Sequence, residues 1–143
     1  MKVWRQFLLP LLIALLLSAP PLSQDKFHRV KRALDGDTLL LTNRDRVRLI
    51  GVNTPEVHES KKLYRDAERT GRDVSTIKQL GKKASEFTKS RVDKKEVRLE
   101  YDQANAHIGH MDEYERILAY IYLKDGILLN AEITKQGYRF AYT

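Results

Sequence analysis

The sequence contains no cysteine. This absence excludes disulfide bonds, catalysis by a cysteine thiolate and a zinc site built on cysteine ligands. Internal repeats and low-complexity tracts are also absent from the sequence. The longest apolar run, Phe7 to Leu17, has eleven residues. A membrane-spanning helix needs about 20 apolar residues, so this run is too short to cross a bilayer comfortably.

The first 23 residues have the order of a secretory signal peptide. Lys2 and Arg5 precede the apolar run, and small residues and prolines follow it. A basic start, a short apolar stretch and a small-residue end are typical of a cleaved export signal. We predict a signal peptide over residues 1–23, a mature domain over residues 24–143 and a secreted or periplasmic location. The alternative is an envelope-associated protein anchored by residues 6–17, the only membrane association that the sequence implies.

The chain is basic. It has 26 Lys and Arg residues against 19 Asp and Glu residues, a formal net charge of +7. Removing residues 1–23 takes away two basic residues and no acidic ones, so the mature domain stays basic. A basic domain attracts polyanions such as nucleic acid, without specifying a sequence. Nothing in the sequence implies a stable protein partner, and we expect a monomer with one modest core.

A β-hairpin is predicted near the start of the mature domain. The apolar runs Thr38–Thr42 and Val47–Val52 flank a polar turn at residues 43–45, which is typical of two antiparallel strands. Arms of equal length about residue 44 would place Asp35 opposite Asn53. The polar segments at the two open ends of the hairpin should therefore meet.

These two ends are rich in oxygen atoms. One carries Asp35-Gly36-Asp37-Thr38 and the other Asn53-Thr54-Pro55-Glu56, and Arg48 lies on the strand between them. Carboxylate, amide and carbonyl oxygens are the ligands that Ca²⁺ and Mg²⁺ need. The pattern predicts a metal site beside an arginine that can bind phosphate. The same residues also fit a simpler interpretation, in which Asp-Gly forms a turn and Thr-Pro-Glu leads into a helix.

The rest of the chain supplies a barrel. Periodicity predicts further strands and helices: strands at Phe27–Leu34, Glu96–Tyr101 and Arg116–Leu123, a helix from about Ser75 to Val92, a long loop over 102–112, and a short helix capped by Asn130 and ended by Gly137. Gly81 costs a helix about 1 kcal/mol relative to Ala, which indicates close packing on a sheet. Residues 57–76 are highly charged and are predicted to be exposed, with one or two helical turns near 61–69, either as a flap over a substrate or as a solvated loop.

Five strands with a helix between the third and the fourth is the order of an OB-fold. The predicted class is α+β, mainly β, with a five-stranded barrel and two to three helices.

The hairpin motifs resemble the staphylococcal (micrococcal) nuclease family. The resemblance rests on Asp-Gly-Asp-Thr at 35–38, the Arg48 strand and Thr-Pro-Glu at 54–56, in that order, and on Asp112-x-Tyr114-x-Arg116 ahead of Leu-Ala-Tyr. It spans about residues 30–137 and implies an OB-fold nuclease. Family members continue into a C-terminal helix, whereas this sequence stops at Thr143, so that helix is expected to be missing.

The resemblance implies a calcium site. Asp37 would supply a carboxylate, Asn53 a side-chain oxygen and Thr54 its backbone carbonyl. The family commonly has Asp where this chain has Asn53, so one unit of ligand charge is lost. We therefore expect weaker calcium binding, with a Kd of roughly 10⁻⁴ to 10⁻³ M, as in extracellular modules.

The resemblance also implies roles in catalysis and substrate binding. Glu56 would position or deprotonate the attacking water, and Arg48 and Arg116 would clamp the phosphate through two nitrogens each. Tyr114 and Tyr142 would lie near the nucleotide. Either arginine could instead be an ion-pair partner within the barrel, and either tyrosine an ordinary rim residue.

Two functions remain open. The first is an exported, calcium-dependent endonuclease that cuts DNA and RNA, single strands preferred, with little sequence specificity and 3′-phosphate products. The second is an OB-fold module that binds single-stranded nucleic acid without cutting it, because Asn53 weakens the metal site. The presence of Glu56, Arg48 and Arg116 favours the enzyme.

Overall fold

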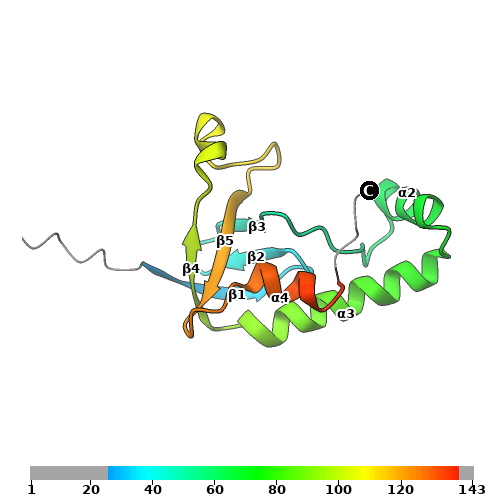
Figure 1. Cartoon of the computed structure of the whole chain (residues 1–143), viewed down its shortest axis with the longest axis horizontal. Coiled ribbons are helices and arrows are strands. Elements are labelled where there is room, and N and C mark those ends of the chain that lie inside the picture. Colours follow the sequence, from blue (N-terminus) through cyan, green and yellow to red (C-terminus); the bar gives the residue numbers. More distant parts are fainter. Residues whose placement is uncertain (1–25, 139–143) are drawn as a thin grey trace, which may run out of the picture.

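The computed structural model describes residues 26–138 (Figure 1). The predicted signal peptide and Tyr142 lie outside this range and remain predictions. Within residues 26–138, no helix is both long enough and apolar enough to cross a membrane.

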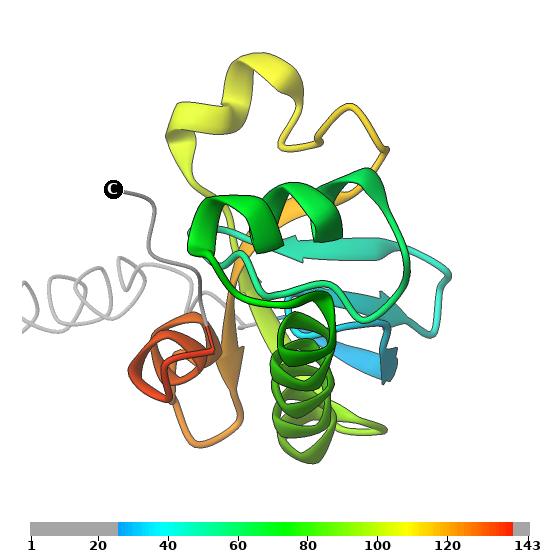
Figure 2. The same cartoon turned by 90° about the vertical axis from the view of Figure 1, so that its right-hand side faces the viewer.

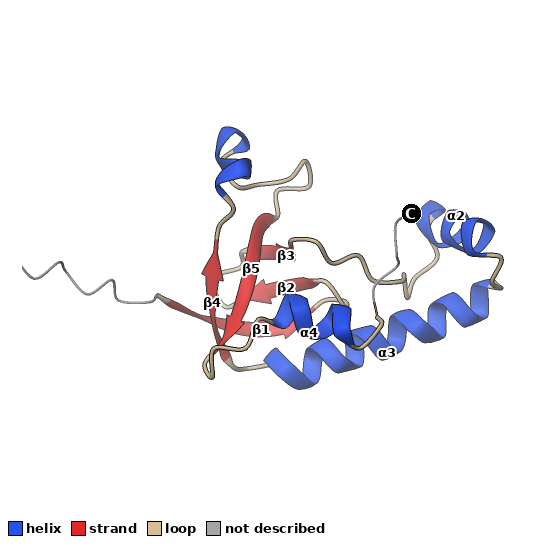
Figure 3. Cartoon of the chain, viewed as in Figure 1, coloured by secondary structure: helices blue, strands red, loops and turns tan. Residues whose placement is uncertain are grey.

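Five strands close into a barrel, which confirms the predicted fold class. The strands are β1 (Phe27–Ala33), β2 (Thr38–Leu41), β3 (Arg46–Leu49), β4 (Glu96–Glu100) and β5 (Ile117–Leu123), paired in the order β1-β2-β3-β5-β4. The helices of the described part are α2 (Lys61–Thr70), α3 (Val74–Val92), α4 (Leu129–Lys135) and the 3₁₀ helix η1 (Gln103–Ile108). In Figure 3, α3 runs along the barrel and continues past it to α2.

The core fills the barrel because apolar side chains alternate along the strands. On β5, for example, Ala119 and Ile121 are fully buried while Tyr120 between them is half-buried. Val92 from α3 and Leu129 and Ile133 from α4 complete the same cluster. The two helices therefore close the barrel and fix their own positions against it.

The hairpin register differs from the prediction by two residues. Thr38 pairs with Arg48, and the Leu49 N–H donates to the Asp37 carbonyl at 2.9 Å. The predicted pairing placed Asp37 two positions further along the second strand, and it is wrong. The chain turns earlier because Arg44 adopts a left-handed φ of 77° and the side chain of Asn43 bonds Asp45. A shift of two residues keeps each side chain on its predicted face.

The charged segment after the hairpin is more ordered than predicted. Helix α2 begins at the Ser60 cap, whose Oγ accepts from the Leu63 N–H at 3.1 Å, and it ends at Gly71 with φ of 65°. Leu63 is fully buried against Ile77 of α3. The helical turns predicted near residues 61–69 are thus present and most residues of α2 are exposed, but the helix is longer than predicted and docks on α3, with Ala67 and Val74 packed beside Leu63 and Ile77.

Asn130 does not cap α4. The helix begins after Leu128 without a side-chain cap. The amide of Asn130 is instead buried, accepting from the Ile121 N–H at 2.9 Å and donating to the Ile50 carbonyl at 2.8 Å. This side chain satisfies one backbone group within β5 and another just after β3, a tertiary role that sequence position does not reveal. Gly137 does adopt the predicted left-handed conformation, with φ of 76°.

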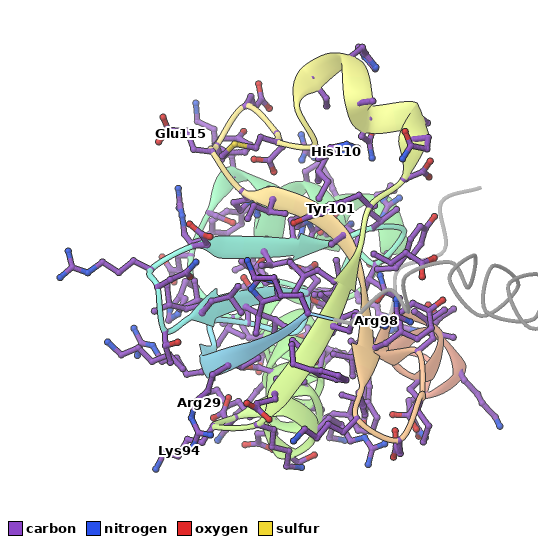
Figure 4. All side chains as sticks on the ribbon, turned by 90° about the vertical axis from the view of Figure 1, so that its left-hand side faces the viewer. Arg29, Lys94, Arg98, Tyr101, His110 and Glu115 are labelled. Atoms are coloured by element: carbon purple, nitrogen blue, oxygen red, sulfur yellow. The ribbon has the colours of Figure 1, made fainter. Side chains whose placement is uncertain are left out.

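The loop between β4 and β5 contains η1 and is closed by a ring contact near its two ends (Figure 4). The ring of Tyr101, which directly follows β4, lies 5.0 Å from the ring of His110. The Leu118 N–H donates to the His110 carbonyl at 2.8 Å. These contacts hold the segment that leads into residues 112–116.

Candidate active site

Helix α3 is the platform for the two oxygen-rich segments at residues 35–38 and 53–56. A Cβ built on Gly36 would come within 2.9 Å of the Ala84 Cβ. The buried Thr88 hydroxyl donates to the Gly36 carbonyl at 2.8 Å. The first segment therefore sits directly on small side chains of the helix.

Gly81 brings the second segment equally close. A Cβ on Gly81 would lie 2.6 Å from the Pro55 carbonyl oxygen and 2.7 Å from that of Glu56. The prediction that Gly81 packs on a sheet is wrong: it packs on the backbone of this segment. Figure 2 looks toward this region, with α2 in front and α3 seen nearly end-on.

Asp37 joins the two segments. Its side chain is buried; Oδ2 accepts from the Thr54 N–H at 2.8 Å and from the Thr54 hydroxyl at 3.1 Å. Oδ1 accepts from the Thr38 hydroxyl at 3.1 Å and forms an ion pair with Arg48. One carboxylate thus fixes the position of Thr54 relative to the hairpin.

Arg48 extends from β3 toward both segments. Besides the ion pair with Asp37, its Nη2 donates to the Asn53 side-chain oxygen at 3.3 Å. The guanidinium side chain is 18% exposed. The guanidinium is therefore accessible from the cavity, while Asp37 and Asn53 hold it in place.

Arg116 is held by Asp112. The Arg116 Nε and Nη2 each lie 2.8 Å from the Asp112 Oδ2, and the Arg116 N–H donates to Oδ1 at 3.0 Å. Partial burial would raise the pKa of Asp112, but these hydrogen bonds, one from the Tyr114 N–H and the Arg116 charge outweigh it and lower the pKa. The Arg116 guanidinium also lies 5.2 Å from the centre of the Tyr114 ring. Two contacts therefore orient this arginine.

These groups surround one cavity of about 450 Å³. Its lining comprises Asp35, Asp37, Arg46, Arg48, Asn53, Glu56, Lys62, Tyr114 and Arg116. Six of the eight residues singled out from the sequence are among them. Thr54 is buried behind the wall, and Tyr142 lies outside the described residues. The structure thus brings the predicted groups together without testing their roles.

Burial raises the pKa of Asp35, although the nearby Arg48 charge and hydrogen bonds with Thr38 partly offset the rise. The Asp35 Oδ1 also accepts from the Asp37 N–H at 2.9 Å.

The cavity has four cationic side chains, Arg46, Arg48, Lys62 and Arg116, among its carboxylates. Such a concentration of positive charge suits an anionic ligand with several oxygens, such as a phosphate.

Two lining residues were not predicted from the sequence. Arg46 lies two residues before Arg48 on the same strand, and its Nη2 donates to the Tyr114 carbonyl at 2.6 Å. Because side chains alternate along a strand, the spacing of the two arginines was a usable signal. Lys62 gave no such signal, since it is one of many charged residues in its segment.

Lys62 contacts two of the predicted functional groups. Its Nζ lies 2.7 Å from the Glu56 Oε1 and 3.1 Å from the Thr54 carbonyl oxygen. Glu56 is thereby held at the cavity wall, with its side chain 36% exposed. The position of this carboxylate depends on α2 as well as on α3.

The oxygen donors suit a hard divalent cation in chemical type. Among residues 26–138, no three His, Cys, Asp or Glu side chains cluster closely enough to hold a metal. The predicted set contains only one carboxylate, Asp37, with the Asn53 amide oxygen and the Thr54 carbonyl, so it does not depend on such a cluster. The ammonium of Lys62 contacts the Thr54 carbonyl and the Glu56 carboxylate, so a positive charge already lies beside these oxygens. The donor types are those that a hard divalent cation takes.

Together these features define an OB-fold protein with a cavity lined by both cationic side chains and carboxylates. The sequence of residues 46–143 matches the family described as Staphylococcal nuclease homologue. The chain belongs to this family. The match begins after Asp35 and Asp37 and includes all the other predicted site residues.

The chain is also similar to individual nucleases. It is 38% identical over 113 residues to the thermonuclease of Staphylococcus intermedius, covering 77% of this chain and 56% of that protein. The thermonuclease of Staphylococcus hyicus is 31% identical over 118 residues, covering 80% and 59%. Endonuclease YncB of Bacillus subtilis is 32% identical over 115 residues, covering 78% and 46%. The chain thus spans about half the length of these relatives.

Proposed function

We propose that this protein is a nuclease that hydrolyses phosphodiester bonds of DNA and RNA with little sequence preference. The observation that carries the proposal is the single cavity lined by Arg48, Glu56 and Arg116 together with Asp37. Family membership and similarity to proteins named thermonuclease and endonuclease support it. We further propose that the nuclease depends on calcium, leaves 3′-phosphate products, prefers single strands, is exported and is a monomer.

The two arginines bind the phosphate. A guanidinium presents parallel N–H donors that match two phosphate oxygens, and such charge-assisted bonds strengthen as negative charge develops. Asp112 orients Arg116 and Asp37 orients Arg48. Because the protein fixes both guanidinium groups in advance, little reorganisation is needed when the substrate enters.

Glu56 acts on the attacking water. Its carboxylate takes a proton from the water as the new bond to phosphorus forms, and the bond from phosphorus to the 5′ oxygen breaks. The departing oxygen takes a proton from solvent, which leaves a 3′-phosphate and a 5′-hydroxyl. General base catalysis of this kind contributes about 10² to 10⁴ in rate.

Asp37, Asn53 and Thr54 are the residues that would hold calcium. When bound, calcium supplies positive charge beside the phosphate oxygens. Asp37 carries the one negative charge of this set and keeps Thr54 in place through its two hydrogen bonds. Asn53 contributes an uncharged oxygen that also accepts from Arg48.

The proposal is tested by degradation of single-stranded DNA, with calcium at millimolar concentration and with excess chelator. The wild-type protein is expected to cut only with calcium, and Arg116→Ala is expected to lose the activity. Arg72→Ala, which removes an exposed arginine outside the cavity lining, is the matched control. Undiminished cutting by the Arg116→Ala protein would refute the assigned site. End-labelling of the products separates 3′-phosphate from 5′-phosphate ends.

One observation favours the binding module as a second candidate. Arg48, Thr38 and Thr54 occupy both oxygens of Asp37, Lys62 occupies the Thr54 carbonyl, and Asn53 is neutral. A site with this little free negative charge binds a divalent cation weakly. A gel shift of single-stranded DNA that persists with calcium present, without degradation, would support this candidate over the nuclease.

A further inference from the structure

The ammonium of Lys62 lies among oxygen atoms, where a metal cation would also be attracted. Its ammonium is within hydrogen-bond distance of the Glu56 carboxylate, at 2.7 Å, and of the Thr54 carbonyl, at 3.1 Å. Its side chain is 26% exposed. One of these oxygens belongs to the proposed calcium ligands and the other to the proposed general base. A tethered positive charge therefore neutralises the groups that the proposed reaction uses.

A second acceptor lies one helical turn away. Asp66 is buried, with 4% of its surface exposed, and its Oδ2 has no hydrogen-bond partner among the described residues. That oxygen lies 3.9 Å from the Lys62 Nζ, while the other oxygen, Oδ1, lies 3.5 Å from Arg69. A buried carboxylate oxygen without a hydrogen bond lowers the stability of the folded protein. The Asp66 Oδ2 gains a hydrogen bond if the Lys62 ammonium moves toward it.

We propose that Lys62 is a tethered competitor of the divalent cation, with two alternative partners. Without a metal it binds Glu56 and the Thr54 carbonyl, as in this structure. When a divalent cation enters, the ammonium moves closer to Asp66, hydrogen-bonds to the carboxylate oxygen that has no hydrogen bond in this structure, and releases both groups. The inference rests on the proposed calcium-dependent function, and it adds a residue of α2 that controls metal affinity and the freedom of Glu56.

The geometry explains why one helix can carry the device. Lys62 and Asp66 are four residues apart, so their side chains lie on the same face of α2. Burial of Leu63 against Ile77 fixes that face toward the cavity. Only the flexible lysine side chain has to move, because the second acceptor is already within 3.9 Å.

Calorimetric titration of calcium, without nucleic acid, tests the proposal directly. Lys62→Met is expected to tighten calcium binding at least tenfold, because the competing charge is gone. Lys62→Arg keeps the charge and is expected to show no such gain. Lys61→Met removes the same charge from an exposed position on the same helix and is the matched control, expected to change the affinity less than twofold. Equal affinities for the Lys62→Met and Lys61→Met proteins would overturn the proposal.

Asp66→Asn tests the second partner. In the wild-type background the displaced ammonium loses the negative charge of its second partner, so calcium affinity is expected to fall at least threefold. In the Lys62→Met background the same substitution is expected to have no effect. Equal effects in both backgrounds would mean that the two charges act independently, and the movement would be refuted. Thermal melts of every variant establish that the proteins compared are folded.

The two levels of the proposal fail in different ways. If calcium binds, nucleic acid is cut and Lys62→Met changes nothing, only the role of Lys62 is refuted. If calcium binds to none of the folded proteins, both the proposed calcium site and the proposed competition by Lys62 are refuted.

Discussion

The backbone of Glu56 lies directly against Gly81 of α3, so closely that a methyl group on Gly81 would come within 2.7 Å of the Glu56 carbonyl oxygen. The neighbouring Pro55 carbonyl would be 2.6 Å from it. The three atoms nearest to such a methyl group are all backbone atoms of residues 55–56, so no flexible side chain is there to move aside. The absence of a side chain at position 81 is therefore a condition for the position of Glu56 in the cavity.

Gly81→Ala should destabilise the protein even though alanine favours helices. The helix gains about 1 kcal/mol, but overpacking costs about 1 to 3 kcal/mol and displaces the segment that carries Glu56. We expect a lower melting temperature and at least a tenfold loss of cleavage. Lys82→Ala, at an exposed position of α3, is the control and should leave both measurements unchanged. A Gly81→Ala protein that melts higher and cuts normally would contradict the packing argument.

Asn53→Asp should tighten calcium binding. The substitution adds one negative charge to a ligand set that has only one, and ligand charge is a main determinant of calcium affinity. The Arg48 guanidinium, whose Nη2 lies 3.3 Å from the Asn53 oxygen, competes for the new carboxylate and limits the gain. We expect about a tenfold lower Kd by calorimetry. Gln79→Glu adds the same charge at an exposed site on α3 and should have no effect; an unchanged affinity for Asn53→Asp would remove residue 53 from the ligands.

Asp112 should contribute stability that depends on pH. Its pKa is lower in the folded protein than its ordinary value of 3.8, so the unfolded chain binds more protons in the interval between the two values. The contribution is therefore fully present above pH 3.8 and is lost as the pH falls through the folded value. Urea unfolding should show Asp112→Asn less stable than wild type at neutral pH, with the difference shrinking in acid. Glu113→Gln, an exposed neighbour, should show no such trend.

The barrel was predictable because its information is local. Strand β5 alternates half-buried and buried residues from Leu118 to Leu123, and the helix at Val74–Val92 repeats apolar residues at helical spacing. The register of the hairpin was not predictable to better than two residues, since it depends on the left-handed conformation of Arg44. A register shift of two residues leaves every side chain on its predicted face of the hairpin, so the predicted site residues still lie together.

The part of the site that could not be predicted comes from tertiary contacts. Lys62 reaches Glu56 only because Leu63 docks α2 on α3, and the charged residues around it look alike in sequence. Gly81 lowers the intrinsic stability of its helix, which indicates a close contact, but the contact is with residues 55–56, about 25 residues earlier in the chain. Neither Lys62 nor Gly81 identifies its partner segment from the sequence alone.

Arg116→Ala should cut the rate of phosphodiester cleavage at least about a hundredfold, the usual scale for loss of a group that stabilises developing charge. Arg116→Lys is the sharper variant, because it keeps the charge and loses the planar group that makes two contacts with Asp112. If the geometry of the fork matters, the lysine variant should recover less than a tenth of the activity; if charge alone matters, it should recover most of it. The unfolding midpoint must be measured alongside, since Asp112 loses its partner in both variants. Near-normal activity of a folded Arg116→Lys protein would therefore refute bidentate recognition of the phosphate and leave only an electrostatic role for this arginine.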